Sequence, residues 1–567
     1  MSERGATSLR AFGSRLEALS SPWLEERVLF DSDGLLVVDK PAGLPVHGGD
    51  DMLAGDVLRR LQQRCLALGQ DPYLGVHQRL DQVTSGVLLL ARDRAQNASL
   101  ARAFDGHQLE RWYVAAVTDP GLPERGRFED RLEPQKGKPT RVVAQGGVAA
   151  VTDFRVLERG GGRALLELRP RTGRTHQLRA QLAHRQAPIA GDAAYGGAPA
   201  WRVMLHAAGL ALPEVGCSFE SPAPEEFAAW ARGLAPALPG AVEQRLRDAL
   251  SLRQPLLAVA SAFRLVNDAG DGLPGVVVDY YDEWVALSLS SDEAEGRRSE
   301  LVAALERQGA RGVYVQRRLR ADLRRLDADR IAPALPEAGE PAPKPLVVRE
   351  YGRACEVWLG DGLSTGLFVD QRENRRRVAE RAAGLRVLNL FSYTGAFTVA
   401  AATGGASRTV SVDLSRPALE RTARALERNG QATRAHRQVE ADAFEFLARP
   451  EVRRGFELVV LDPPSFATKR RGKTFSLSKD FRRLIALALG AVADGGQLLV
   501  VTNHRKTDPA RLRRLAHGAA RDAGRTLTSV RDGPAQVDCP PGPTGPFPSK
   551  SLWLAVARPA PYTLGRR

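Results

Sequence analysis

Cysteine is scarce in this chain, with four residues in 567: Cys65, Cys217, Cys355 and Cys539. They stand far apart, without the close pairs that a zinc site or a redox motif needs. The sequence therefore predicts reduced thiols and no metal centre.

Long apolar runs are also missing. No stretch approaches the ~20 consecutive apolar residues of a membrane-spanning helix. The first residues, MSERGATSLRAFGSRLEALSSPW, lack the continuous apolar core of a secretory signal. We expect a globular, cytoplasmic protein that does not enter a membrane.

Acidic residues are outnumbered, because 66 Asp and Glu face 81 Lys and Arg, which gives a formal charge of +15 and a pI near 10.1. Such an excess favours a polyanionic partner, nucleic acid first, since phosphate contacts release counterions. An arginine-rich composition bias, visible in residues 317–325, explains the charge equally well.

The chain is too long for one hydrophobic core, so we expect several domains. After an N-terminal extension, 1–27, residues 28–235 carry short β-like runs between Gly and Pro, which indicate a mainly antiparallel sheet with a few helices. Residues 236–255 are predicted as a linker with a polar, Pro-punctuated helical segment, followed by a small α+β domain at 256–345. From 346 to 560, apolar strands alternate with helix-length segments, which is typical of a parallel α/β fold.

The stretch VHQRLDQVTSGVLLLA places Asp81 between Arg79 and a turn that leads into an apolar strand. Taken alone, this aspartate is either a turn cap or a catalytic carboxylate. Five other segments stand in order along the chain: DKPAGLPVH, RWYVAAV, RPRTGRTHQLRAQLA, IAGDAAYGG and LHAAGL. With them, residues 28–225 resemble the RluA family of pseudouridine synthases.

The RluA resemblance implies an α+β pseudouridine synthase fold without a cofactor. It implies three catalytic residues, namely Asp81 as nucleophile, Tyr113 beside the target base and Arg179 as the partner of the aspartate. An ionised carboxylate suits a reaction that breaks a C–N bond and forms a C–C bond, and an arginine stabilises the ionised form. RNA contacts would come from Arg79, Arg174 and His176, with Arg79 entering the space of a flipped nucleotide. Tyr113 is also explained as a strand aromatic, and Arg79 as a surface phosphate contact.

The sequence departs from the family at Gln78, which separates His77 from Arg79 where the family has His directly before Arg-Leu-Asp. The role of His77 therefore stays open. Fewer than thirty residues precede the first expected strand, too few for the S4-type RNA-binding domain of some relatives, so we expect the RNA contacts to come from elsewhere.

In the C-terminal half, RVLNLFSYTGAFTVAAATGGA joins a strand, a Gly-containing turn and a small-residue helix, as a nucleotide-binding βα unit does. Asp413 ends the next strand, where a carboxylate can accept hydrogen bonds from ribose hydroxyls. Asp442 and Asp462 follow later strands, so three acids should face one crevice. Each acid taken singly is also explained as a helix cap or a turn residue.

Around this unit, GLSTGLFVDQRENRR and DPPSFATKR make residues 260–557 resemble the RlmK and RlmI group of large-subunit rRNA methyltransferases. The resemblance implies a Rossmann-like class I domain that binds S-adenosyl-L-methionine, preceded by a small central domain. It assigns the methionine and ribose parts of the cofactor to Phe391, Tyr393, Gly395 and Asp413, and the adenine to Asp442. Asp462 would line the transfer site, and Phe466 would offer a face to a target base in RNA, although simple packing explains Phe466 equally well.

The prediction of which base atom is methylated rests on the absence of a cysteine. Cytosine C5 is a poor nucleophile until a cysteine thiolate adds to C6. RlmI-type enzymes carry that cysteine after the fifth strand, where this chain reads LLVVTNHRK, with Asn503 and His504; Cys539 is a weaker candidate. Guanine N7 needs only correct placement, so the sequence favours 7-methylguanosine over 5-methylcytosine.

Together these patterns predict a bifunctional enzyme that isomerises uridine and methylates a base in RNA, most directly 23S rRNA. A methyltransferase whose N-terminal half only docks RNA, and a non-catalytic ribosome-assembly factor, are the alternatives. A protein that only binds RNA has no chemical need for Asp81, Tyr113 and Arg179. Nor does it need Asp413, Asp442 and Asp462. The modified positions, the oligomeric state, and whether both sites act on one RNA do not follow from the sequence.

Overall fold

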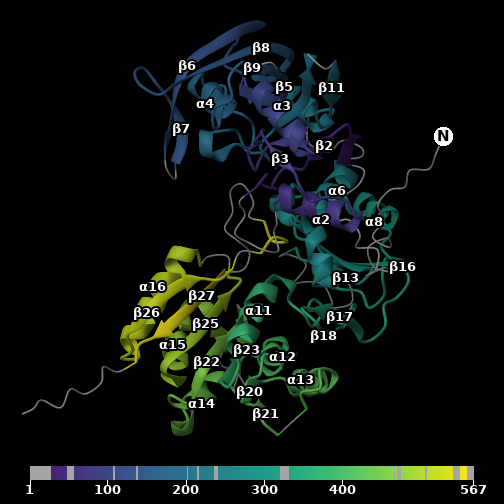
Figure 1. Cartoon of the computed structure of the whole chain (residues 1–567). Helices are drawn as coiled ribbons and strands as arrows, with labels where there is room; N and C mark the ends of the chain where they lie inside the picture. Colours follow the sequence, from purple (N-terminus) through teal and green to yellow (C-terminus); the bar gives the residue numbers. More distant parts are fainter. Residues whose placement is uncertain are drawn as a thin grey trace, which may run out of the picture.

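Three larger sheets follow one another along the chain, together with two short hairpins (Figure 1). The structure is a computed structural model that describes residues 27–47, 56–105, 109–135, 138–200, 202–213, 216–234, 241–319, 331–432, 434–464, 466–468, 474–504, 507–534, 536–540 and 550–558. The multidomain organisation expected from the chain length is confirmed. Within these residues no helix is both long and apolar enough to cross a membrane.

The first sheet runs in the order β1-β2-β4-β10-β5-β9-β8-β6-β7, with β3 beside β4 and β11 beside β10. Most neighbours are antiparallel, and β4 with β10 is a parallel pair. The strands are β1 Val28–Ser32, β2 Leu35–Lys40, β3 Gly75–Val76, β4 Ser85–Ala91, β5 Glu110–Thr118, β6 Arg125–Gln135, β7 Lys138–Val143, β8 Val148–Gly160, β9 Arg163–Pro170, β10 Leu205–Leu212 and β11 Cys217–Glu220.

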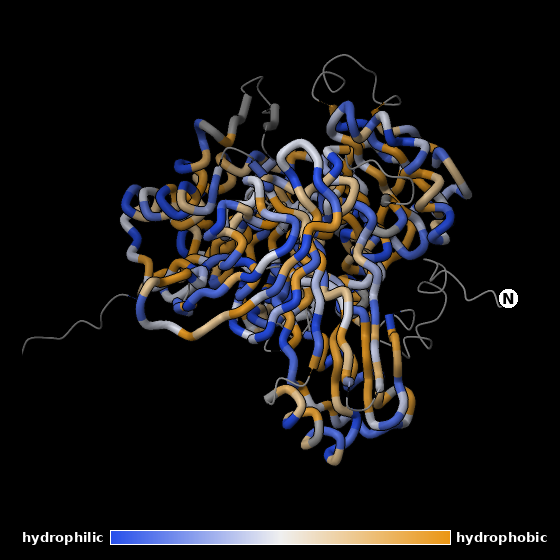
Figure 2. Tube along the Cα trace, turned by 90° about the horizontal axis from the view of Figure 1, so that it is seen from above, coloured by the Kyte–Doolittle hydropathy of each residue, from blue (hydrophilic) through white to orange (hydrophobic). Residues whose placement is uncertain are grey.

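Helices cover both faces of this sheet around β4, which is buried at all of its positions. Leu36 and Val38 pack with α2 on one face, whereas Leu35 and Val37 pack with α3 on the other, because successive strand residues point to opposite sides. The helices are α2 Val57–Ala67, α3 Arg94–Asp105, α4 Gln177–His184 and α5 Glu225–Ala231. This α+β arrangement agrees with the expected fold class, and Figure 2 shows apolar and polar residues interspersed along the chain.

The second sheet has the order β12-β13-β14-β15-β16 and is joined by a separate hairpin, β17–β18. Its elements are β12 Ala262–Asn267, β13 Val276–Tyr281, β14 Trp284–Leu289, α7 Asp292–Gly296, α8 Arg298–Arg307, β15 Gly312–Arg317, β16 Ala338–Gly339, β17 Leu346–Glu350 and β18 Arg353–Val357. Leu346 and Val357 of the hairpin share an apolar cluster with Tyr281 and Trp284. The hairpin, expected beyond the central domain, therefore packs on the central sheet.

Residues 236–255, expected as a linker, contain a packed helix, α6 Ala241–Arg253. Val242, Leu246, Ala249 and Leu250 lie in the apolar core of the central sheet. The other side of α6 contacts the first sheet's domain, because Arg27 donates to Asp248 and Arg60 donates to the carbonyl of Ser251. The segment is therefore a structural joint between the two.

The third sheet has the order β21-β20-β19-β22-β25-β27-β26; its first five strands are parallel, and β27 is antiparallel to both neighbours. The strands are β19 Arg386–Leu390, β20 Arg408–Asp413, β21 His436–Glu440, β22 Phe456–Leu461, β25 Val492–Thr502, β26 Leu527–Asp532 and β27 Lys550–Val556, and a short hairpin is formed by β23 Phe466–Thr468 and β24 Thr474–Ser476.

One face of this sheet packs against α11 and α12, and the other against α14, α15 and α16. The helices are α11 Arg372–Arg381, α12 Ala396–Thr403, α13 Arg416–Arg428, α14 Ala443–Leu447, α15 Leu477–Ala491 and α16 Pro509–Asp522. This is the Rossmann-like α/β arrangement expected for the C-terminal domain. The carboxyl ends of β19, β20, β21 and β22 therefore share one edge.

Candidate functional sites

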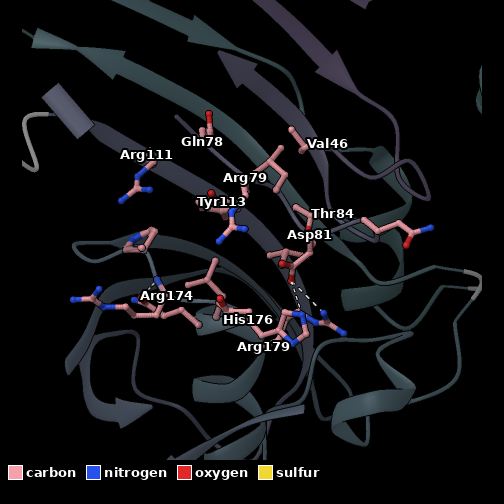
Figure 3. Close-up of a pocket in the computed structure, with 18 of the residues that line it drawn as sticks. Val46, Gln78, Arg79, Asp81, Thr84, Arg111, Tyr113, Arg174, His176 and Arg179 are labelled. Carbon is pink, nitrogen blue, oxygen red and sulfur yellow. Dashed lines mark hydrogen bonds and ion pairs between the residues drawn. The ribbon is translucent and has the colours of Figure 1, made fainter. Parts of the chain in front are cut away.

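Asp81 lies in the loop between β3 and β4 and lines a cavity of about 480 Å³ (Figure 3). Its Oδ2 accepts a hydrogen bond from Nη1 of Arg179 at 3.1 Å. His176 brings Nε2 to 3.9 Å from the same oxygen. The carboxylate is thus partly open to the cavity and held from one side by a cation.

Arg179 is fixed more firmly than its contact with Asp81 alone would allow. It lies on α4 with 7% of its surface exposed, and its Nε and Nη2 donate to the two oxygens of the buried Asp192 at 2.7 and 2.9 Å. Burial disfavours the charge of Arg179, but Asp192 and Asp81 raise its pKa above the ordinary value. Because the guanidinium is planar, this bidentate contact sets the direction in which Nη1 meets Asp81.

Tyr195 completes this group from the short helix after Asp192. Its hydroxyl lies 3.0 Å from Nδ1 of His176, and Arg179 stands 5.0 Å from the centre of its ring. His176 has a left-handed backbone, with φ 55°, just before α4. Asp192 and Tyr195 were not predicted as site residues, although both lie in the segment IAGDAAYGG.

Tyr113 projects from β5 and lines the same cavity as Asp81. Burial raises the pKa of its hydroxyl. The exposed Arg79 and Arg174 also line the cavity, so the structure brings together all the residues predicted for this site. Gln78 is buried beside them, whereas Nε2 of His77 contacts Oδ1 of Asn97 at 2.7 Å.

The Asp81 loop is anchored from behind by Lys40, which the sequence did not single out. The buried Nζ donates to the carbonyls of Leu44 at 2.7 Å and Gln82 at 3.2 Å, and so ties two loops together. Burial lowers the pKa of Lys40 to about 7. The anchor restricts where Asp81 can move.

The second site begins at the turn after β19. Phe391, Tyr393 and Gly395 all have positive φ there, with values of 57°, 47° and 80°. A side chain at Gly395 would collide with Thr422, since an added Cβ would lie 2.3 Å from its Cγ2. The buried Ser392 Oγ has no hydrogen-bond partner among the described residues. A tight turn with an unused polar atom fits a cofactor that passes close to the backbone.

Asp413 and Asp442 lie at the ends predicted for them, where both also bind backbone. Asp413 accepts from the amides of Tyr393 and Ser415, each at 2.9 Å. Oδ1 of Asp442 caps α14 by accepting from Phe444 at 2.8 Å. Asp442 is therefore a helix cap and Asp413 a turn residue, and both retain carboxylate lone pairs for hydroxyl or amino donors.

Asp462 directly follows β22 and differs from the other acids in its surroundings. Burial, and then the nearby Asp370, raise the pKa of Asp462 to about 7. Asp370 was not predicted, although it stands in the segment GLFVDQRENRR; its pKa is also raised by burial. Phe466 belongs to β23, and its side chain lies outside the described part.

The chain thus combines two candidate sites in separate domains, which we call heads. One site lies on the first, mainly antiparallel sheet and the other on the third, mainly parallel sheet. Residues 34–184 match the family model for RNA pseudouridylate synthase, and residues 309–535 match that for S-adenosylmethionine-dependent methyltransferase. The protein is accordingly an enzyme with a synthase head and a methyltransferase head, and the second uses S-adenosyl-L-methionine.

Similarity to known proteins shows which class of methyltransferase the C-terminal domain belongs to. Ribosomal RNA large subunit methyltransferase I of Alteromonas mediterranea is 31% identical over 51% of this chain and 72% of its own length. Ribosomal RNA large subunit methyltransferase K of Neisseria meningitidis is 46% identical over 28% of this chain and 46% of its own length. The crystal structure of SMU.776 complexed with SAH is 27% identical, covers 60% of this chain and 85% of that one, and has a TM-score of 0.50. The chain belongs to the ribosomal RNA large subunit methyltransferase family and carries an RNA pseudouridylate synthase head in front.

Proposed function

We propose that this enzyme forms pseudouridine and 7-methylguanosine in large-subunit rRNA. The observation that carries the proposal is the presence of two separate sites, each with its own acid, in one basic chain. The names of the methyltransferase relatives support large-subunit rRNA as the substrate. A net charge of +15 favours such a polyanion.

In the synthase head, Asp81 is the proposed nucleophile towards the uridine. Arg179 keeps its charge opposite the carboxylate and steadies it while the C–N bond breaks. Tyr113 lies against the detached base and takes part in removing the proton at C5. Arg79, Arg174 and His176, at the cavity wall, hold the RNA once the nucleotide has left its stack.

In the methyltransferase head, the bound cofactor supplies an electrophilic methyl sulfonium. Phe391, Tyr393, Gly395 and Asp413 hold its methionine and ribose parts, and Asp442 accepts from its adenine amino group. Asp462 lies between these strands and β25, where it orients the acceptor base, and Phe466 gives that base a stacking partner.

Guanine N7 is the favoured acceptor because it requires no covalent adduct. The residues after β25 are Asn503 and His504, with no cysteine. Cys539 is a poor source of thiolate, because burial and the neighbouring Asp538 raise its pKa well above the ordinary value. Both observations disfavour 5-methylcytosine.

The test treats bacterial large-subunit rRNA with the wild-type chain, Asp81→Asn and Asp462→Ala, followed by mass spectrometry of the nucleosides. We expect wild type to yield pseudouridine and 7-methylguanosine, and each variant to lose only its own product. Methylation without pseudouridine in wild type would support an RNA-docking N-terminal half, and absence of both products would support an assembly factor.

A further inference from the structure

A second cavity, of about 300 Å³, lies at the edge of the methyltransferase sheet, and Cys539 is the one lining residue that the sequence analysis considered. It is bounded by the start of α11 on one face and the start of α16 on the other, with Gln536, Cys539 and Lys550 between them. Its volume is at the low end for small-molecule pockets, which suits a single nucleobase.

Strand register places this cavity beside Asp462, on the side away from the proposed cofactor residues. Leu461 pairs with Val500, so Asp462 is level with Val501, which pairs with Ser551 of the cavity wall. Two strand spacings separate their backbones, roughly 10 Å. Phe391, Asp413 and Asp442 lie at or just after the ends of β19, β20 and β21, on the opposite side of β22. Asp462 thus stands between the two regions.

The polar atoms of the cavity have a definite pattern. Nε2 of Gln536 donates to the backbone carbonyl of Asp370, which fixes the amide and leaves Oε1 as a buried acceptor without a hydrogen-bond partner among the described residues. The carboxyl of Asp370 is a second acceptor, and Lys550 offers a cationic donor that already holds the carbonyl of His504 at 3.1 Å. The ammonium has three N–H groups, so this contact does not exhaust it.

The wall is rigid before any ligand arrives. Arg372 at the start of α11 donates to both oxygens of Asp538, each at 2.7 Å, and both side chains are fully buried. Arg253 of α6 also donates to the carbonyl of Asp538, at 2.9 Å. Residues 536–539 are therefore fixed to α11 and to the joint helix.

We propose that this cavity binds the Watson–Crick edge of the acceptor guanine. The edge presents N2–H₂ and N1–H as donors and O6 as an acceptor, which match, in that order, Gln536 Oε1, the Asp370 carboxyl and the Lys550 ammonium. N7 lies on the opposite side of the purine from N2, so a guanine held in this way turns N7 out of the cavity towards Asp462. The inference rests on the proposed guanine N7 methylation and names the residues that select guanine.

The test is calorimetric titration of the full chain, saturated with SAH, using GMP, IMP and CMP. IMP lacks the N2 amine, so we expect GMP to bind about tenfold more tightly than IMP, and more tightly than CMP. Gln536→Leu should weaken GMP binding about tenfold and erase the difference from IMP. Lys550→Met should weaken GMP and IMP equally, because both carry O6. The matched control is Asp522→Asn, at the far end of α16, where Asp522 pairs with Arg482 outside the cavity, and it should bind like wild type.

Equal binding of GMP and CMP, or unchanged GMP binding by Gln536→Leu, would overturn the assignment of the cavity. SAH affinity and pseudouridine formation report whether each variant is folded. If wild type makes 7-methylguanosine while Gln536→Leu methylates normally, the cavity is wrong and the proposed function stands. If the GMP preference holds but rRNA is methylated at another atom, the proposed N7 acceptor fails instead.

Discussion

The two heads place an aspartate in opposite surroundings. Asp81 has a cation 3.1 Å away, and that cation is itself fixed by the buried Asp192. Asp462 has no such cation at hydrogen-bond distance among the described residues; its neighbour is a second half-buried acid, Asp370. The surroundings of Asp462 favour its neutral form, because burial and the neighbouring acid raise its pKa, whereas Asp81 faces a fixed guanidinium.

Residue type alone therefore does not define a chemical role. A nucleophile must keep a negative charge that it can share with the substrate, whereas a carboxyl that only orients a base can gain or lose its proton with the base's own hydrogen bonds. The proposed roles of Asp81 and Asp462 agree with this division.

Asp81→Asn should produce the largest effect. An amide cannot act as the nucleophile, so we expect pseudouridine formation to fall by on the order of 10⁴-fold. Methylation by the same preparation should remain at the wild-type level. Single-turnover assays of both products measure this, and parallel loss of both activities would show that the heads do not work separately.

Asp192→Asn should have the next largest effect, because it removes one charge from a buried pair. Leaving Arg179 without its bidentate partner should lower the free energy of unfolding by about 3–5 kcal/mol and slow pseudouridine formation. Urea unfolding measures the first quantity. Asp130→Asn is the control, since Asp130 pairs with Arg185 near the same helix but does not contact Asp81. Equal losses of synthase activity in both variants would argue against a positioning role for Asp192.

The next largest effect concerns pH. The methylation rate should depend on pH through a carboxyl that belongs to the methyltransferase head alone. With a pKa of about 7, Asp462 ionises near neutrality, and its charged form stabilises the positive charge that guanine gains when N7 takes the methyl group. We expect the methylation rate to rise through pH 7 in wild type and to lose this inflection in Asp462→Asn. Asp370→Asn should move the inflection to lower pH, because a neighbouring negative charge has gone. An inflection that ignores both substitutions would assign the titration elsewhere.

The same carboxyl has a consequence for stability. The folded chain holds the Asp462 proton more tightly than the unfolded chain, so its contribution to stability is present at low pH and lost as pH rises from about 4 to about 7. Asp462→Asn should therefore flatten the decline in unfolding free energy over that window. Urea unfolding at several pH values measures the slope, and an unchanged slope would contradict the raised pKa.

Some residues of the two sites could be predicted from the sequence, and others could not. Asp81, Tyr113 and Arg179 were predicted because each sits in an ordered motif, and all three line one cavity. Gln536 and Asp370 were missed, because their contact joins positions 166 residues apart and no local pattern reports it. A helical segment within residues 236–255 follows from the sequence, but its packing does not, because the contacts of Val242, Leu246, Ala249 and Leu250 with the central sheet are set by the tertiary fold.

Tyr195→Phe should give the smallest effect and probes the synthase network most finely. The ring beside Arg179 is kept, and only the hydroxyl near His176 is lost. A neutral hydrogen bond contributes about 1 kcal/mol, so we expect pseudouridine formation to slow by roughly fivefold, with methylation unchanged. Single-turnover rates with the same rRNA measure this. A loss as large as that of Asp192→Asn would mean that the hydroxyl, rather than the ion pair, positions the catalytic carboxylate.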